Sequence, residues 1–193
     1  MSALVQADSE RLLAALRTVL AQKGIATAPE ILDRITITDA ASPALGARMV
    51  ARAWLDADYR ELLLSDGTRA AEMLGIVMRG APPLGVMACT PDTHTLVVCT
   101  LCSCYPRAVL GYPPYWYKSA AYRARAVREP RGLLAEFGTV LPEGTRIRVV
   151  DSTADYRWMV LPLRPAGTDD FSEDQLAGLV RAGDMIGVTQ VRV

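Results

Sequence analysis

Apolar residues near the start of the chain recur with the period of a helix. Those between residues 8 and 23 lie three or four positions apart, at Leu12, Leu13, Leu16, Val19 and Leu20. This spacing predicts an amphipathic helix that ends at Gly24. Four later segments begin with proline or a polar residue and continue with apolar residues at helical spacing. They predict four more helices, at residues 28–35, 42–54, 58–64 and 67–74.

The pattern changes after residue 84. Short apolar runs bounded by turn residues are typical of buried strands, and alternation of polar and apolar residues is typical of a half-buried one. Five strands are predicted in this way, at residues 85–89, 96–99, 146–150, 158–161 and 185–188. Helices are predicted between them, at residues 119–128, 130–137 and from Ser172 onward.

The chain thus begins with predicted helices and continues with a mixture of strands and helices. This order indicates an α+β fold. We expect a helical arm over residues 1–50, which contacts the core or a partner subunit, and a core over residues 51–193. Such an arm is expected to depend on its neighbours, because its apolar stripe needs a partner to cover it.

Charge gives the chain no evident preference for polyanions. It carries 21 Lys+Arg and 21 Asp+Glu, for a net charge of +0, so nothing in the balance favours nucleic acid or an anionic membrane as a partner. The sequence has no run of 18 apolar residues, and its start does not resemble a secretory signal. We therefore expect a cytoplasmic protein without a membrane span.

Three of the four cysteines lie within one stretch, VVCTLCSCY at residues 97–105. They are Cys99, Cys102 and Cys104, whereas the fourth, Cys89, is interpreted as a small buried hydrophobe. Clustered thiols in a chain of cytosolic type are more typical of metal binding or redox chemistry than of a disulfide framework.

Zinc and thiol redox chemistry each explain this cluster only in part. A structural zinc site needs four ligands, and the single histidine, His94, is separated from Cys99 by a predicted strand. Cys89 is available as a fourth thiolate, but nothing in its spacing requires it. Redox chemistry needs two cysteines and leaves the third without a role.

The geometry of a C-S-C segment offers another solution. Two backbone amide nitrogens, those of Ser103 and Cys104, lie between the sulfurs of Cys102 and Cys104. If both amides lose their protons, two sulfurs and two nitrogens can surround one metal ion in a plane, with the sulfur of Cys99 as a fifth ligand. Ionising an amide requires a strongly acidic ion, for which trivalent cobalt or iron is better suited than zinc.

These residues resemble a known family, the nitrile hydratase α subunit. The segment VCTLCSC resembles its metal-binding loop, called the claw, and the resemblance extends from about Trp54 to Val188. The stretches that carry it are AWLD (53–56), LLSDG (63–67), LGYPPYWYKS (110–119), YRARAVREPR (122–131), LPLRPAG (161–167) and MIGV (185–188).

The resemblance implies a fold, an activity and a site. The fold would be a layered α/β/β/α core with mixed sheets, and the activity hydration of a nitrile to an amide at non-corrin Co(III) or at Fe(III). The metal ligands would be the sulfurs of Cys99, Cys102 and Cys104 and the amide nitrogens of Ser103 and Cys104. Cys102 would be a sulfinate and Cys104 a sulfenate. Thr100 resembles the cobalt type.

The family also implies partners. A β subunit would supply two arginines that hold the sulfur oxygens, a third subunit occurs in some relatives, and a metallochaperone or activator is expected. Catalysis would involve Cys104, Cys102 and Ser103, with the oxygen on Cys104 acting as the nucleophile or as a base towards water. The sequence leaves these two roles open.

One residue after the claw departs from the family pattern. Arg107 replaces the bulky aromatic that usually walls the pocket, which indicates either a roomier, more polar substrate pocket or an arginine that faces solvent or an interface. The first interpretation favours a large polar nitrile such as a nucleoside nitrile. Two alternatives remain, namely the metal subunit of a thiocyanate hydrolase and a non-catalytic metal-binding subunit.

Overall fold

The structure, a computed structural model, describes residues 3–193, with side chains from residue 6 onward. The chain divides into two compact units, the first ending at Ala40 and the second covering residues 41–193. The arm boundary expected at residue 50 falls inside helix α3 (Pro43–Leu55), which belongs to the second unit. None of the helices in residues 3–193 is both long and apolar enough to cross a membrane.

The first unit consists of two helices, α1 (Ala3–Gln22) and α2 (Ala28–Ala40). Helix α2 continues past the predicted end at residue 35. At its start, Thr27 donates two hydrogen bonds to the carboxylate of Glu30, from the backbone nitrogen (2.7 Å) and from Oγ1 (2.8 Å), which satisfies a helix end that would otherwise lack partners. Large apolar side chains on both helices are exposed, among them Leu12 (72%) and Leu32 (64%).

The second unit contains the remaining helices. Three of them begin at side-chain caps that accept a backbone N–H, at Asp56, Asp66 and Ser119, and a fourth begins at Ser172 with a full capping box. The helices after α3 are α4 (Ala57–Ser65), α5 (Gly67–Met73), α6 (Arg107–Leu110), α7 (Tyr115–Lys118), α8 (Ala120–Arg128), α9 (Pro130–Glu136), α10 (Glu173–Leu179) and α11 (Ala182–Ile186).

Four strands form two ladders of two strands each. Strand β1 (Leu84–Ala88) pairs with β4 (Arg157–Leu161), and β2 (Thr93–Val98) pairs with β3 (Arg146–Asp151). Both pairings are parallel, where mixed sheets were expected from the family. Three of the five predicted strands agree within one residue at each end, and β2 begins three residues before the predicted start at residue 96 and ends before Cys99.

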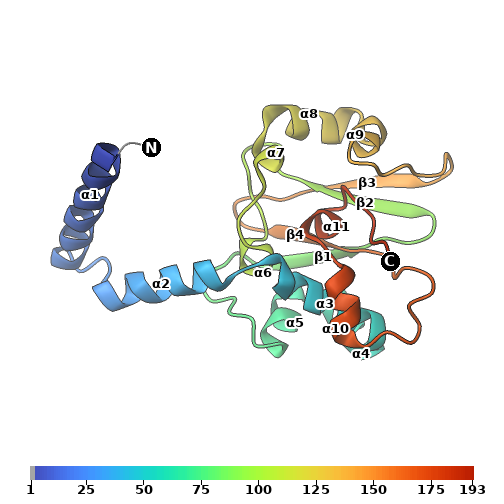
Figure 1. Cartoon of the computed structure of the whole chain (residues 1–193), viewed down its shortest axis with the longest axis horizontal. Helices are drawn as coiled ribbons and strands as arrows, with labels where there is room; N and C mark the ends of the chain where they lie inside the picture. The colour runs from blue at the N-terminus through green and yellow to red at the C-terminus, as the bar shows by residue number, and fades with distance from the viewer. Residues whose placement is uncertain (1–2) are drawn as a thin grey trace. The chain divides into compact units, whose positions relative to one another are not determined.

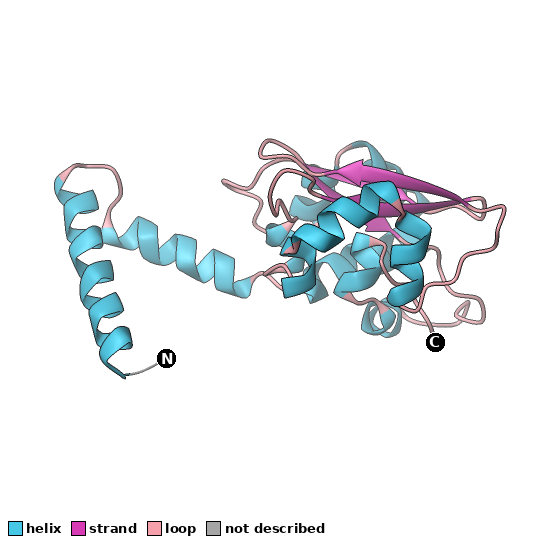
Figure 2. Cartoon of the chain, turned by 90° about the horizontal axis from the view of Figure 1, so that it is seen from above, coloured by secondary structure: helices cyan, strands magenta, loops and turns pink. Residues whose placement is uncertain are grey.

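The strands lie between two layers of helices (Figure 1). Helices α8 and α9 pack against β2 and β3, and α4 and α5 pack against β1 on the other side. Figure 2 shows the same core with its strands in magenta. The α+β class is thus confirmed. All six residues of β2 are buried, as is usual for a parallel strand covered on both faces, and this central strand leads directly into the cysteine cluster.

The predicted strand at residues 185–188 is wrong. Met185 and Ile186 lie in the short helix α11, where the backbone N–H of Arg181 donates to the Asp184 carboxylate (2.8 Å) at the helix start. Gly187 ends the helix with a φ of 84°, in the left-handed region that favours glycine. A short apolar run does not distinguish a buried strand from a buried helix. Here the hydrogen bond between Arg181 and Asp184 at the start of the segment favours the helix.

Candidate metal centre

The cysteine cluster occupies the loop between β2 and α6. Cys99 follows the last residue of β2 and is 1% exposed, and Tyr105 at the other end of the loop is also buried (3%). Between these two anchors Leu101 is 86% exposed. The loop is therefore fixed at both ends in the core, while its middle projects into solvent.

The three thiols converge. Sγ of Cys102 lies 3.3 Å from Sγ of Cys99 and 3.1 Å from Sγ of Cys104, and all three sulfurs fall within 4.8 Å of one another. Cys99 and Cys104 are buried, whereas Cys102 is exposed. Three soft sulfur donors at this spacing can hold one metal ion, and the exposed side leaves an open approach to it. The residues present thus fit a metal centre.

The loop backbone also faces the sulfurs. The N–H of Cys102 donates to Sγ of Cys99 (3.2 Å). Hydrogen bonds with the side chains of Cys104 and Cys99 and, to a smaller extent, with the backbone N–H groups of Ser103 and Cys104 together lower the pKa of the Cys102 thiol to about 7. The two amides singled out from the sequence thus favour a thiolate at Cys102. Burial, followed by the hydrogen bonds with Cys102 and Cys99, raises the pKa of Cys104 to about 12.

Asp151 anchors the loop from a neighbouring strand, which the sequence analysis missed. It is the last residue of β3 and pairs with Val98 in the parallel ladder. Its carboxylate accepts two hydrogen bonds from Thr100, one from the backbone nitrogen (3.0 Å) and one from Oγ1 (2.5 Å). Asp151 therefore positions the loop between Cys99 and Cys102 without belonging to the thiol cluster.

Replacing Asp151 by Ala is expected to weaken metal binding by roughly 10- to 100-fold, the usual cost of losing a residue that orients metal ligands. The measurement is the metal retained per chain against a competing chelator of known affinity. Asp155→Ala is the matched control, because Asp155 is exposed just after β3 and its carboxylate makes no contact with the loop. Equal metal retention in both variants would contradict the positioning role.

Two buried tyrosines on the helical side hold the loop and the end of β2 that leads into it. The hydroxyl of Tyr117 donates to the carbonyl of Cys104 (2.8 Å), and that of Tyr122 donates to the carbonyl of Val97 (2.6 Å). Tyr105 packs edge-on against Tyr117, with ring centroids 5.0 Å apart. The hydroxyl of Tyr117 thus connects the helical layer to the backbone of the last cysteine of the cluster.

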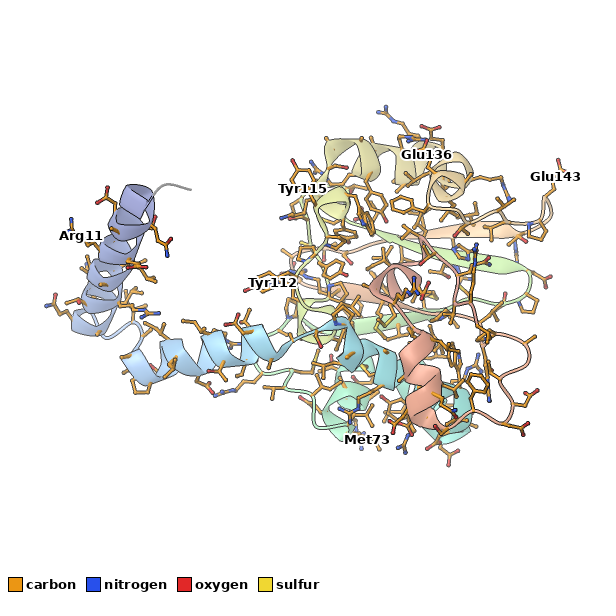
Figure 3. The ribbon with its side chains drawn as sticks, viewed as in Figure 1. Arg11, Met73, Tyr112, Tyr115, Glu136 and Glu143 are labelled. Atoms are coloured by element: carbon orange, nitrogen blue, oxygen red, sulfur yellow. The ribbon has the colours of Figure 1, made fainter. Side chains whose placement is uncertain are left out.

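Arg107 lies on the surface at the start of α6, three residues after the last cysteine. Its guanidinium carbon is 4.4 Å from the ring centroid of Tyr112, which places a cation over an aromatic face. Tyr112 is 64% exposed and Tyr115 is 87% exposed, and Figure 3 shows both side chains pointing away from the core. The segment that follows the cluster, from α6 to the start of α7, thus presents arginine and tyrosine to solvent.

The arginines of helix α8 lie in two different environments. Arg123 donates to the carbonyl of Thr100 (3.3 Å) and, with Arg128, lines a surface hollow of about 310 Å³ beside the loop. Arg125 makes ion pairs with Glu129 and Glu136, both at 2.6 Å. Arg123 and Arg128 therefore border the loop at Thr100, whereas Arg125 joins α8 to α9.

Neither additional zinc ligand joins the cluster. His94 is near the start of β2, opposite the end that carries Cys99, and its Nε2 lies 2.7 Å from the carbonyl oxygen of Gly187. Cys89 is 3.9 Å from His94, measured from Sγ to Nδ1. Among the described residues the cluster comprises three cysteines, so His94 and Cys89 do not complete a tetrahedron there.

Comparison with known proteins places these features in a family context. A family profile described as "Nitrile hydratase, alpha chain" matches residues 7–189. The chain is 47% identical to the low-molecular weight cobalt-containing nitrile hydratase subunit alpha of Rhodococcus rhodochrous, over 91% of this chain and 85% of that protein. It is 43% identical to the thiocyanate hydrolase subunit gamma of Thiobacillus thioparus, over 94% and 79%.

A solved structure supports the fold. A double mutant of the Fe-type nitrile hydratase from Comamonas testosteroni Ni1 superimposes with a TM-score of 0.83 at 40% identity, covering 99% of this chain and 92% of that one. A likeness over almost the whole length of both chains includes the layered core and the loop that carries the thiols.

Proposed function

This chain belongs to the nitrile hydratase alpha-chain family, and we propose that it is the metal-bearing subunit of an enzyme that hydrates a nitrile to an amide. The observation that carries the proposal is the convergence of three cysteine sulfurs within 4.8 Å at the carboxyl end of β2. The open side at Cys102 supplies the access that a substrate needs.

The proposed ligands are the sulfurs of Cys99, Cys102 and Cys104 and the amide nitrogens of Ser103 and Cys104. Cobalt(III) is the proposed ion, with iron(III) as the alternative, because the relative of highest identity reported above is named as cobalt-containing and Thr100 resembles the cobalt type. When bound, the ion supplies Lewis acidity towards the nitrile or water.

The chain's own residues would set the geometry and supply an oxygen. We propose that an external oxygen-donating oxidant adds two oxygen atoms to Cys102, which becomes a sulfinate, and one to Cys104, which becomes a sulfenate, as the family implies. Tyr117 holds the Cys104 carbonyl, and this bond fixes the main chain from which both the sulfur and the amide nitrogen of Cys104 project. The oxygen on Cys104 would attack the nitrile carbon or take a proton from water.

A β subunit is the proposed partner. Leu101, Tyr112 and Tyr115 expose large apolar surfaces around the thiol loop, and exposed aromatic residues beside arginines are typical of interface cores. The apolar residues exposed on α1 and α2 are a second surface for a partner subunit, in line with the arm expected over residues 1–50. A third subunit and a metallochaperone or activator remain part of the proposal.

Co-expression with a β subunit and cobalt tests the proposal. The expected result is about one cobalt per chain, nitrile hydration that the separate chain lacks, and a claw peptide whose mass shows three added oxygens. Tetrahedral zinc at the thiols would overturn the proposed site. Stoichiometric cobalt without turnover in the assembled complex would favour the non-catalytic metal-binding subunit.

The proposed substrate is a large polar nitrile, such as the nucleoside nitrile toyocamycin. Arg107 carries this proposal, because an arginine on the surface beside the cluster leaves a polar wall where the family usually has a bulky aromatic. Thiocyanate hydrolysis is the second candidate, favoured by the 43% identity to a thiocyanate hydrolase subunit and by the suitability of a cation for an anionic substrate. Turnover of thiocyanate but not of the nucleoside nitrile would decide for it.

Replacing Arg107 by Trp is expected to reduce kcat/KM for the preferred substrate more than about tenfold, a loss of about 1.4 kcal/mol in transition-state binding, while a small aliphatic nitrile is still hydrated. Steady-state kinetics on both substrates check this. Arg60→Trp is the control, since Arg60 is an exposed arginine on α4. An unchanged ratio of the two kcat/KM values would show that Arg107 does not line the pocket.

A further inference from the structure

A second cavity lies at the opposite end of β2 from the thiol loop. Its volume is about 240 Å³, and the residues that line it include Cys89, His94, Pro142, Asp184 and Gln190. Cys89 and His94 are both buried, at 7% and 5% exposure. The cavity therefore brings the fourth cysteine and the single histidine of the chain together, in a place that nitrile hydration does not use.

The cysteine and the histidine are close enough to share one ion. Sγ of Cys89 lies 3.9 Å from Nδ1 of His94. Metal–sulfur and metal–nitrogen bonds of about 2.3 Å and about 2.0 Å sum to about 4.3 Å, so an ion between the two atoms reaches both with a widely open angle. No movement of the backbone is needed to bridge them.

The histidine is already oriented as a ligand. Its Nε2 lies 2.7 Å from the carbonyl oxygen of Gly187, and a carbonyl can only accept, so Nε2 carries the hydrogen. This leaves the lone pair on Nδ1, the atom nearest to Cys89. Metal-binding histidines commonly donate their second ring nitrogen to a backbone carbonyl in this way. Burial lowers the pKa of His94, which keeps the ring neutral.

The sulfur has partners that suit a thiolate. The backbone N–H of Thr95 donates to Sγ of Cys89 (3.3 Å), and the positive charge of Arg148 acts on Cys89 against the effect of burial. Burial is nevertheless the larger effect and raises the pKa of Cys89, so the group is a thiol at neutral pH. A thiol of this kind is a poor nucleophile, but a soft metal ion can displace its proton.

We propose that Cys89 and His94 form a second metal site, separate from the claw, that binds one soft cation of low coordination number such as Cu(I). Asp184 lines the same cavity, but its carboxylate already accepts from Thr189 Oγ1 (2.5 Å) and from the Arg181 backbone (2.8 Å). Two free donors are too few for tetrahedral zinc, whereas soft thiolate ligands select Cu(I).

Charge also favours a monovalent ion. Binding replaces the thiol proton by the cation, so one proton is released for each ion bound. The product pairs one positive ion with one thiolate and a neutral imidazole, and its net charge is zero. A neutral group of this kind avoids the large cost of burying an isolated charge.

Anaerobic titration of the reduced full chain with Cu(I), buffered by a chelator of known affinity, tests this site. Because claw thiols also bind Cu(I), the informative quantity is the difference between variants. Cys89→Ser is expected to bind one Cu(I) fewer per chain than the unmodified protein and to release one proton fewer. Gln190→Ala, which alters the same cavity without removing either ligand, is expected to bind the full number.

His94→Gln separates a two-ligand site from a lone thiol. The glutamine amide can still donate to the Gly187 carbonyl, while the imidazole nitrogen is lost, and we expect the affinity for this one ion to fall at least about tenfold. Equal Cu(I) counts in the unmodified chain and Cys89→Ser would overturn the site, as would an unchanged affinity in His94→Gln. The site does not rest on the proposed hydration activity, which Cys89→Ser is expected to leave intact.

Discussion

Replacing Cys104 by Ala is expected to remove nearly all bound metal and to reduce the rate of nitrile hydration more than about 100-fold. This reduction is larger than the roughly 10- to 100-fold loss that follows from removing a residue that only orients a metal ligand. Cys104 contributes both its sulfur, 3.1 Å from that of Cys102, and a proposed amide ligand. Without its Sγ the cluster retains only the pair Cys99 and Cys102. Elemental analysis and steady-state rates on the assembled complex measure both effects.

The control removes Cys89, a thiol that is not among the proposed ligands of the hydration centre. Cys89→Ala also deletes a buried cysteine, but Cys89 lines the cavity at the other end of β2, so cobalt content and hydration are expected to stay at the level of the unmodified protein. Circular dichroism and the melting temperature show whether either variant is misfolded. A folded Cys104→Ala complex with full cobalt and full turnover would refute the proposed site.

The clustering of the three thiols could be predicted from the sequence because it is local. Three cysteines within six positions are at most roughly 17 Å apart in any fold, and a turn between them brings the sulfurs together, while covalent geometry fixes the amides between Cys102 and Cys104. Asp151 could not be predicted in this way, because it is 51 residues from Thr100 and reaches it only through the parallel register that sets Val98 beside Asp151. The signal that would have found it is a polar residue at the end of the strand paired with β2.

The secondary structure shows the same difference: features with a local cause could be predicted from the sequence, and features that depend on tertiary packing could not. Helices with polar caps, such as the one that begins after Ser172, were predicted because the capping residues are adjacent in sequence. The pairing of β2 with β3, with almost fifty residues between them, depends on packing that no local pattern encodes. Met185 and Ile186 were misassigned because a short buried apolar run suits both states.

Gly187, which ends helix α11, is the position at which we expect a substitution to have the largest effect on stability. Replacing Gly187 by Ala is expected to destabilise the fold by about 3 to 5 kcal/mol, in the range reached by severe backbone and packing clashes. A φ of 84° costs an L-residue roughly 1 kcal/mol. A Cβ at this position would in addition lie only 2.0 Å from the carbonyl oxygen of Thr95, a rigid backbone atom in the central strand β2.

Gly138→Ala is the matched control for this prediction. Gly138 has nearly the same backbone conformation, with a φ of 79°, but a Cβ there meets nothing within 4 Å. Its substitution should cost only the conformational term of roughly 1 kcal/mol, so the melting temperatures of the two variants, or their urea midpoints, isolate the contact with Thr95. If both variants melt together, the close approach of α11 to β2 does not hold the core. If Gly187→Ala alone is strongly destabilised, the left-handed glycine after α11 is what allows the C-terminal segment to pack against the strand that carries the claw.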